Sequence, residues 1–150
     1  MPRSPARSDN ERRTELIDEP SIREFVQWWF VALGARDAQA LVDMTNTDVV
    51  IRPFLARQPV EAVGYYGHDG IRDWVGSLDS YVRISLNLID IDSMGTDAAV
   101  VEAEVFFERD ASRTGGVTFS VWRFRDGKLS EAVGYGSKEE ALDAEHRSWH

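Results

Sequence analysis

Three consecutive strand patterns in the C-terminal half constrain the fold of this 150-residue chain more than any other feature. They cover residues 97–108, 117–124 and 128–135. Asp126 and Gly127 join the last two, and this dipeptide is typical of a tight hairpin because glycine adopts positive φ without a steric penalty. Residues 109–116, which end in two glycines, are predicted to form a longer loop between the first two. The pattern predicts consecutive antiparallel strands.

Helical patterns precede these strands. Ser21 and Glu24 have the spacing of a capping box, and apolar residues then recur at helical spacing until Gly34. Asp37 is predicted to cap a shorter second helix. The remaining predicted elements are a strand at 49–52, a third helix after 65–67, a strand at 81–92 and a capped final helix at 138–146. This order predicts an α+β fold, in which a strongly bent antiparallel or mixed sheet wraps around three helices as a cone with an internal pocket.

The composition indicates one globular domain, predicted at residues 21–146 between polar tails at 1–20 and 147–150. A net charge of −9 argues against nucleic acid or an anionic membrane as a partner. No apolar run reaches the roughly 18 residues of a membrane span, and the N-terminal residues lack the apolar core of a signal peptide. We therefore expect a cytoplasmic protein.

The sequence predicts neither a metal nor a cofactor. It has no cysteine, and His68 is its only interior histidine, because the other two, His146 and His150, lie at the C-terminal end. Glycine motifs that bind phosphates or dinucleotides are also missing from it.

Several short motifs, in this order of elements, resemble the SnoaL-like branch of the nuclear-transport-factor-2-like (cystatin-like cone) superfamily. They are D-V-V-I-R-P at 48–53, Y-G-H-D-G-I-R-D-W at 66–74 and V-W-R-F-R-D-G-K at 121–128. The resemblance covers about residues 22–144. It implies a cone with a pocket for a small molecule, but not one activity, because the superfamily contains isomerases, polyketide cyclases, epoxide hydrolases, dehydratases and plain binders.

Glu102 and Glu104 are the first candidate catalytic residues. They lie two positions apart on one predicted strand and therefore share a face of the sheet. The alternation alone allows this face to be solvent-exposed. The layout implied by the resemblance instead turns both glutamates and Phe106 toward the helices, in register with Ser120 and Trp122. A carboxylate desolvated there, beside a second one, would suit acid–base chemistry near neutral pH.

Arg52 is the third candidate catalytic residue. Its guanidinium group is predicted to pair with the carboxylate of Glu104, which would leave Glu102 as the more available acid or base. The catalytic residues of ketosteroid isomerases would fall at or next to Arg52, at Trp29 and at Ser120, and none of them matches. The remaining candidates are predicted to line a substrate pocket: Trp29, Tyr65, His68, Phe106, Ser120, Trp122 and Gly134.

Two classes of function remain open. One is a cofactor-independent cyclase, isomerase or hydratase that acts on a small hydrophobic oxygenated compound. The other is a non-catalytic domain that binds a ligand or a partner subunit. Inward carboxylates favour the enzyme, whereas the missing catalytic residues of the resembled families favour the binder.

A homodimer through the convex face of the sheet is also predicted. In the register described above, that face carries a contiguous set of apolar side chains, larger than a monomer usually exposes. They are Val101, Ala103, Val105, Phe107, Phe119, Val121, Val133 and Tyr135. Arg123 and Glu131 are predicted to lie on the same face.

Overall fold

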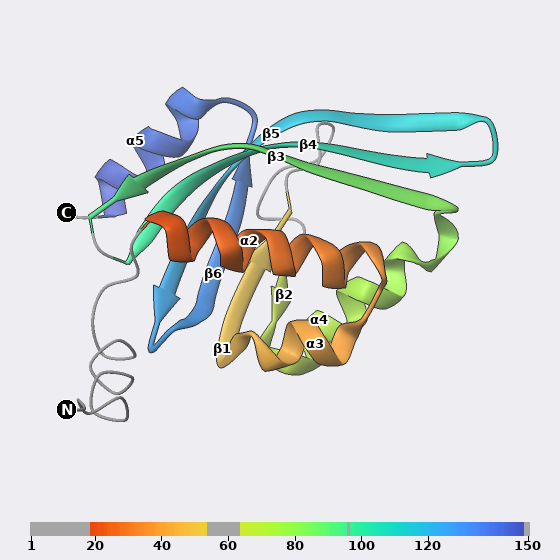
Figure 1. The fold of residues 1–150 in the computed structure, drawn as a ribbon, viewed down its shortest axis with the longest axis horizontal. Coiled ribbons are helices and arrows are strands. Elements are labelled where there is room, and N and C mark those ends of the chain that lie inside the picture. The colour runs from red at the N-terminus through yellow and green to blue at the C-terminus, as the bar shows by residue number, and fades with distance from the viewer. Residues whose placement is uncertain (1–18, 54–63, 96, 149–150) are drawn as a thin grey trace, which may run out of the picture.

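The computed structural model describes residues 19–53, 64–95 and 97–148 (Figure 1). Its helices are α2 (Glu19–Gly34), α3 (Ala38–Asp43), α4 (Gly67–Ser77) and α5 (Lys138–Ser148), with a 3₁₀ turn at Leu78–Ser80. Its strands are β1 (Thr45–Arg52), β2 (Tyr65–Tyr66), β3 (Arg83–Met94), β4 (Ala98–Arg109), β5 (Ser112–Arg125) and β6 (Lys128–Tyr135). None of the described helices is long and apolar enough to cross a membrane.

The six strands form one mixed sheet in the order β2-β1-β6-β5-β4-β3. Strands β3 to β6 are an antiparallel meander, and β1 joins it in parallel beside β6. Helices α2, α3 and α4 share a core with one face of the sheet, which we call the helix side. Helix α5 lies on the opposite face, which we call the outer face (Figure 1). The predicted α+β class and mixed, bent sheet are confirmed.

Local sequence signals fix several element ends as predicted. Asp126 and Gly127 both have positive φ, 57° and 77°, and form the hairpin turn before β6. The carboxylate of Asp37 accepts a hydrogen bond from the Ala40 amide at 3.1 Å and caps α3. At α5 the Ser137 hydroxyl accepts from the amide N–H of residue 140 at 3.1 Å.

Two other local predictions are wrong. Helix α2 already begins at Glu19, so Ser21 lies inside it and is not its cap. The predicted loop at 109–116 is largely strand, because β5 begins at Ser112 and pairs with β4 up to Arg109. The two glycines that indicated a loop extend the hairpin instead. The predicted tail up to residue 18 and the loop at 54–63 lie outside the described residues.

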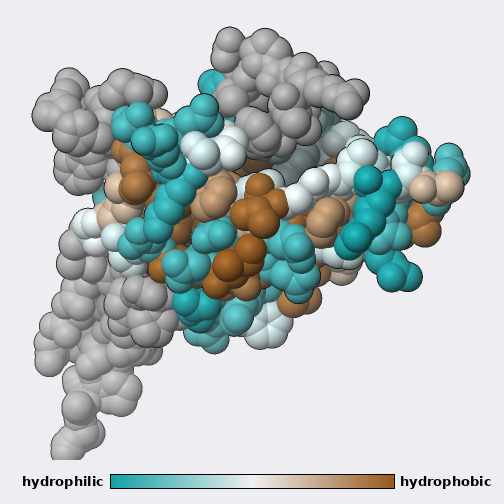
Figure 2. Space-filling view, turned by 90° about the horizontal axis from the view of Figure 1, so that it is seen from above, coloured by the Kyte–Doolittle hydropathy of each residue, from teal (hydrophilic) through white to brown (hydrophobic). Residues whose placement is uncertain are grey.

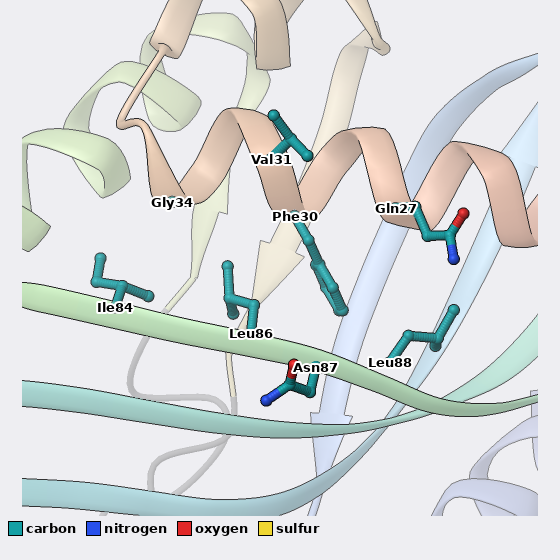
Figure 3. A pocket seen from close by; sticks show the side chains of 8 residues that line it. All are labelled: Gln27, Phe30, Val31, Gly34, Ile84, Leu86, Asn87 and Leu88. Carbon is teal, nitrogen blue, oxygen red and sulfur yellow. The ribbon is translucent and has the colours of Figure 1, made fainter.

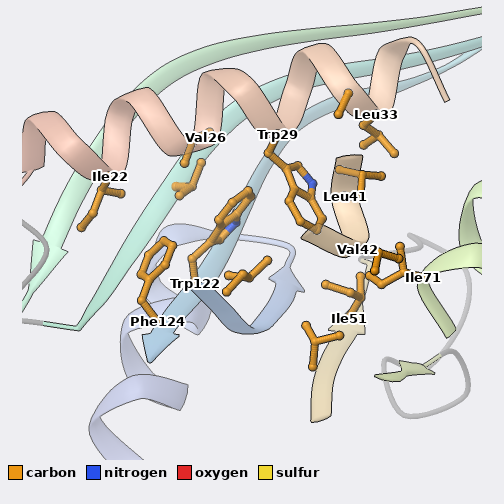
Figure 4. Close-up of a cluster of buried hydrophobic side chains, with 14 of the residues drawn as sticks. Ile22, Val26, Trp29, Leu33, Leu41, Val42, Ile51, Ile71, Trp122 and Phe124 are labelled. Atoms are coloured by element: carbon orange, nitrogen blue, oxygen red, sulfur yellow. The ribbon is translucent and has the colours of Figure 1, made fainter. Parts of the chain in front are cut away.

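The core on the helix side is built around aromatic side chains (Figure 4). Trp29 of α2 is 2% exposed and its ring lies 5.7 Å from that of Trp122 on β5. Phe25 contacts Phe124 edge-on, with ring centroids 5.1 Å apart. Aliphatic side chains from all three helices and from β1 complete this core, including Ile22, Val26, Leu41, Ile51 and Ile71.

The register predicted for β4 is wrong. Val101 pairs with Ser120, and Glu102 pairs with Phe119, so odd-numbered residues of β4 point to the helix side. Val101 is 1% exposed in the main core, and Ala103 is also buried. Glu102 and Glu104 therefore lie on the outer face. The physical reason is that carboxylates lose their hydration in a core, whereas valine and alanine gain free energy there.

The outer face is partly covered by α5. Ala141 of this helix packs on Val100 and Val121, with Met94, Phe119 and Tyr135 at the edge of the cluster. Residues 119, 121, 133 and 135 lie on this face as predicted, but their predicted neighbours on β4 do not. The predicted placement of Arg123 and Glu131 on one face is confirmed, and they form an ion pair of 3.2 Å within the chain.

The observed register makes a first prediction. Val101→Asp buries a carboxylate in the core, so we expect the free energy of unfolding to fall by about 3 kcal/mol or more. Glu104→Val changes a residue of the outer face, so it should alter that free energy by about 0.5 kcal/mol or less. Urea denaturation of both variants measures the difference, and the opposite ranking would restore the register predicted from the sequence.

The two glycines of β5 make a second prediction. Both have positive φ, 138° at Gly115 and 150° at Gly116, so alanine is strained at either by about 1–3 kcal/mol. A Cβ atom at Gly115 would also overlap the carbonyl oxygen of Val105 and lie 2.9 Å from Cα of Phe106, whereas at Gly116 it would meet nothing within 4 Å. Thermal unfolding should therefore show Gly115→Ala to be the less stable variant. Equal melting temperatures would contradict this close approach of β4 and β5.

Candidate functional site

Small and hydroxyl side chains form a wall on the helix side of β5 and β6. Ser120 pairs with Val101 on one side and with Gly134 on the other, so its side chain points toward the helices. Thr118 lies two positions earlier on the same face and donates a hydrogen bond to the Ala103 carbonyl at 3.3 Å. The half-buried Ser120 hydroxyl makes no hydrogen bond to any described residue. This wall therefore combines small side chains with one available hydroxyl group.

A row of aromatic rings leads from the core toward the surface. Trp29 lies between Trp122 and Trp74, with ring centroids at 5.7 Å and 6.2 Å. Tyr65 of β2 continues the row, 6.2 Å from Trp74 of α4. Trp29 and Trp122 are buried, whereas Trp74 and Tyr65 are half-buried. Trp74 and Tyr65 therefore form the solvent-accessible end of the row. Trp29 and Trp122, which were predicted to line the pocket, are core residues.

The predicted site residues do not come together as one group. Trp29, Tyr65, Ser120, Trp122 and Gly134 share the helix side. Glu102, Glu104 and Phe106 lie on the outer face, opposite Phe119, Val117 and Gly115 of β5. Figure 2 looks onto the molecule from that side and shows hydrophobic groups scattered among hydrophilic ones.

Glu102 and Glu104 have polar neighbours across β3. Glu102 pairs with Asp90 and Glu104 pairs with Asn87, and both glutamates are only partly buried. From Ala99 to Phe107 and from Thr114 to Trp122, the helix-side positions of β4 and β5 carry no ionisable side chain. The candidate acid–base groups and the candidate wall are therefore on opposite faces of the sheet.

Arg52 does not pair with Glu104. It lies beside Val133 on the outer face, with its guanidinium carbon 5.4 Å from the centre of the Tyr66 ring. Strands β6 and β5 separate β1 from β4, which places the two residues about 14 Å apart or more. Arg52 stabilises the β1–β2 edge through a cation–π contact instead.

Phe106 and His68 have structural partners. The guanidinium carbon of Arg113 lies 3.7 Å from the centre of the Phe106 ring. His68 lies in the first turn of α4, and its Nε2 lies 3.3 Å from the carbonyl oxygen of Thr45. A carbonyl only accepts, so Nε2 carries the donated proton and ties α4 to β1.

The ion pair between Arg125 and Asp48 on the sheet is not a second candidate site. Arg125 donates a hydrogen bond of 2.6 Å to Asp48, which holds the pKa of that carboxyl below its usual range. Both side chains are more than half exposed, so this is a surface ion pair between β1 and β5. No group of three potential metal ligands occurs among the described residues.

A groove with a volume of about 430 Å³ lies between α2 and β3, away from the wall of β5 and β6 (Figure 3). Its lining is mostly apolar, with two amide side chains: Gln27, Phe30, Val31, Gly34, Ile84, Leu86, Asn87 and Leu88. No residue of this groove was a candidate from the sequence. The apolar alternation of residues 84, 86 and 88 was the available signal, but it predicted only a strand.

Trp74 and Thr118 also were not among the predicted site residues. Trp74 belongs to the apolar stripe of α4, which by spacing alone predicts core. Thr118 was missed because it has the same periodicity as Ser120 but no distinguishing motif. The small residues Ala132 and Gly134, two positions apart in the last strand, are a sequence signal for this wall.

No protein-family model matches this sequence. No curated protein matches it either. Similarity is found at the level of three-dimensional structure, among solved proteins of low sequence identity.

One similar structure is RV0760c from Mycobacterium tuberculosis in complex with estradiol-17beta-hemisuccinate, with a TM-score of 0.63, 15% identity, and coverage of 77% of this chain and 92% of that one. A ketosteroid-isomerase-like protein from Catenulispora acidiphila, in complex with trimethylamine, has a TM-score of 0.63 at 17% identity, with 80% and 90% coverage. An LEH-like epoxide hydrolase from M. tuberculosis has a TM-score of 0.61 at 14% identity, with 83% and 88% coverage.

These similarities each cover between 77% and 83% of this chain and agree with the α+β fold that the sequence predicted. They support the fold and leave the SnoaL-like subtype as a prediction. The chain therefore has the fold of the NTF2-like, ketosteroid-isomerase-like and cystatin-like proteins.

Proposed function

We propose that this protein binds a small hydrophobic molecule that carries at least one oxygen, on the helix side of its sheet. The observation that supports the proposal is the wall of β5 and β6. There the half-buried Ser120 hydroxyl stands between the small residues Ala132 and Gly134 and the aromatic row. Small-molecule sites typically combine mostly apolar walls with a few polar groups of this kind.

The binding function is proposed without acid–base catalysis by Glu102 or Glu104. Their side chains lie on the outer face, and a general acid or base must come within hydrogen-bond reach of the group it protonates. The cyclase, isomerase or hydratase activity implied by the resemblance thus loses the carboxylates on which it rested. Ligands of similar structures agree with a binding role, since one of them holds a steroid ester. The cytoplasmic location stays a prediction.

Titration with estradiol-17beta-hemisuccinate, followed by tryptophan fluorescence, tests the proposal. Ser120→Leu fills the wall and removes its hydroxyl, so we expect binding to weaken by about tenfold or more, equivalent to 1.4 kcal/mol. Glu104→Leu makes the same kind of change on the outer face and serves as the matched control. A ligand that both variants bind as tightly as the wild type would place binding elsewhere.

A further variant, tested for ligand binding and for turnover, distinguishes a binder from an enzyme that uses the predicted acids. Glu102→Gln keeps the shape of the side chain and removes its charge. Under our proposal it leaves ligand binding unchanged, and a loss of turnover of any oxygenated substrate in this variant would reinstate the catalytic role.

A homodimer through the outer face is our second proposal. Val117 is 48% exposed there, next to the half-buried Phe119 and Tyr135, so an apolar area remains beside α5 despite the corrected register of β4. The glutamates of one copy and Arg113 of the other provide opposite charges for such a contact. This surface is smaller than the one predicted from the sequence, because α5 already covers Val100 and Val121.

Sedimentation velocity at micromolar concentrations checks the dimer. Val117→Lys introduces a charge into the centre of the proposed contact and should convert a dimeric wild type into a monomer, with an unchanged melting temperature. Val82→Lys, at a still more exposed valine next to β3, is the control. A monomeric wild-type protein would rule the proposal out.

A further inference from the structure

The groove between α2 and β3 is bounded by the edge of the sheet. Strand β3 is last in the strand order and pairs with β4 along one side only. No described strand pairs with its outer edge over the twelve residues Arg83–Met94. Such an edge presents backbone N–H and C=O groups that can pair with another extended chain.

Exposed apolar side chains concentrate around this groove. Seven large apolar side chains are exposed in the described residues, and four of them lie on α2, on β3 or at the start of β3. Trp28 and Val31 on α2 are 60% and 62% exposed, and Val82 and Ile89 flank the strand segment between them. A bulge between Leu88 and Asp90 leaves Ile89 outside the regular pairing with β4. The apolar lining of the groove thus continues onto its rim.

Apolar and polar side chains alternate along β3 in the way that pairing with an added strand requires. Ile84, Leu86 and Leu88 point toward α2, and Phe30 of α2 extends toward them (Figure 3). The polar side chains of β3 point the other way, and Arg83 and Asp90 bracket the segment that holds the three groove residues. Both charged residues are exposed. A chain paired with β3 would therefore meet apolar groups on one face and opposite charges at its two ends.

A single extended segment suits the edge better than a second copy of this protein. Each copy carries α2 beside β3, with the groove between them. A two-fold pairing of β3 with itself would bring two α2 helices onto one face of the joined sheet, where packed helices need about 8–10 Å between their axes. An extended segment has no such helix to accommodate.

We propose that the groove binds an extended peptide segment of a partner protein, which adds a strand to the outer edge of β3. The segment carries apolar side chains at alternate positions, facing α2. Paired antiparallel to β3, it has a basic residue opposite Asp90 and an acidic residue opposite Arg83. Backbone hydrogen bonds supply affinity in this mode of recognition, and the alternate side chains in the groove supply selectivity.

A designed peptide tests the proposal with the full-length protein. The probe is acetyl-Lys-Val-Thr-Val-Thr-Val-Glu-amide with a fluorescent label, in which the three valines correspond to Leu88, Leu86 and Ile84. Its control is acetyl-Lys-Val-Val-Val-Thr-Thr-Glu-amide, which has the same composition without the alternation. Fluorescence anisotropy should show that the probe binds about tenfold or more tightly than the control.

Two glycine variants locate the bound peptide. Gly34 lines the groove, and a Cβ atom there would meet nothing within 4 Å, so Gly34→Leu fills the groove while leaving the core intact. Gly76 in α4 is equally open and lies outside the groove, so Gly76→Leu is the matched control. We expect Gly34→Leu to weaken binding of the probe by about tenfold or more and Gly76→Leu to leave it unchanged.

Three results of the peptide titrations would overturn the proposal. They are no binding of the probe up to about 1 mM, equal binding of the two peptides, and binding that Gly34→Leu does not change. A wild-type dimer that Gly34→Leu dissociates would assign the groove to a second copy and also overturn it. None of these measurements uses the ligand or the variants of the helix-side wall, so failure here leaves the proposed small-molecule function standing.

Discussion

The pairing of Val101 with Ser120 across β4 and β5 determines what each face of this sheet can do. Because side chains alternate along a strand, this one pair turns every odd-numbered residue of the central part of β4 to the helix side and every glutamate of that strand outward. A shift by one residue would exchange the two sets and bury two carboxylates beside Trp29 and Trp122. The cost of dehydrating those carboxylates is what makes the register unambiguous.

Sequence patterns predicted those features that depend on local chemistry. The Asp126-Gly127 turn, the Asp37 cap and the limits of β6 are each determined by a few neighbouring residues, and all were predicted correctly. The β4 register was not, because residues 98–101 are apolar at every position and are buried on both faces, by the core and by α5. The alternation there does not distinguish the faces, and the layout implied by the resemblance then placed the glutamates inward.

The candidate site was likewise predicted only in part, where local sequence determines the structure. Ser120 and Gly134 were predicted on the correct side of the sheet because their strands are joined by the strongly specified Asp126-Gly127 turn. Tyr65, predicted for the pocket without a strand, lies on the same side through its pairing with Ile51. The positions and partners of Arg52, Glu102 and Glu104 depend on contacts across several strands. The spacing of residues along the chain does not determine such contacts. The same fold occurs in proteins described as ketosteroid-isomerase-like, epoxide-hydrolase-like and computationally designed binders, so function here depends on individual side chains rather than on architecture.

The parallel contact between β1 and β6 has a consequence for how the chain folds. Asn46 donates a hydrogen bond of 2.9 Å to the hydroxyl of Ser130, 84 positions later, whereas β3 to β6 are joined as successive hairpins. Closing so long a loop costs more entropy than forming hairpins, so the meander should assemble before β1 joins it. During synthesis, α2, α3 and β1 leave the ribosome well before β6 exists. Their apolar surfaces then have no sheet to cover them, and this interval is when the nascent protein is most prone to aggregation or to capture by chaperones.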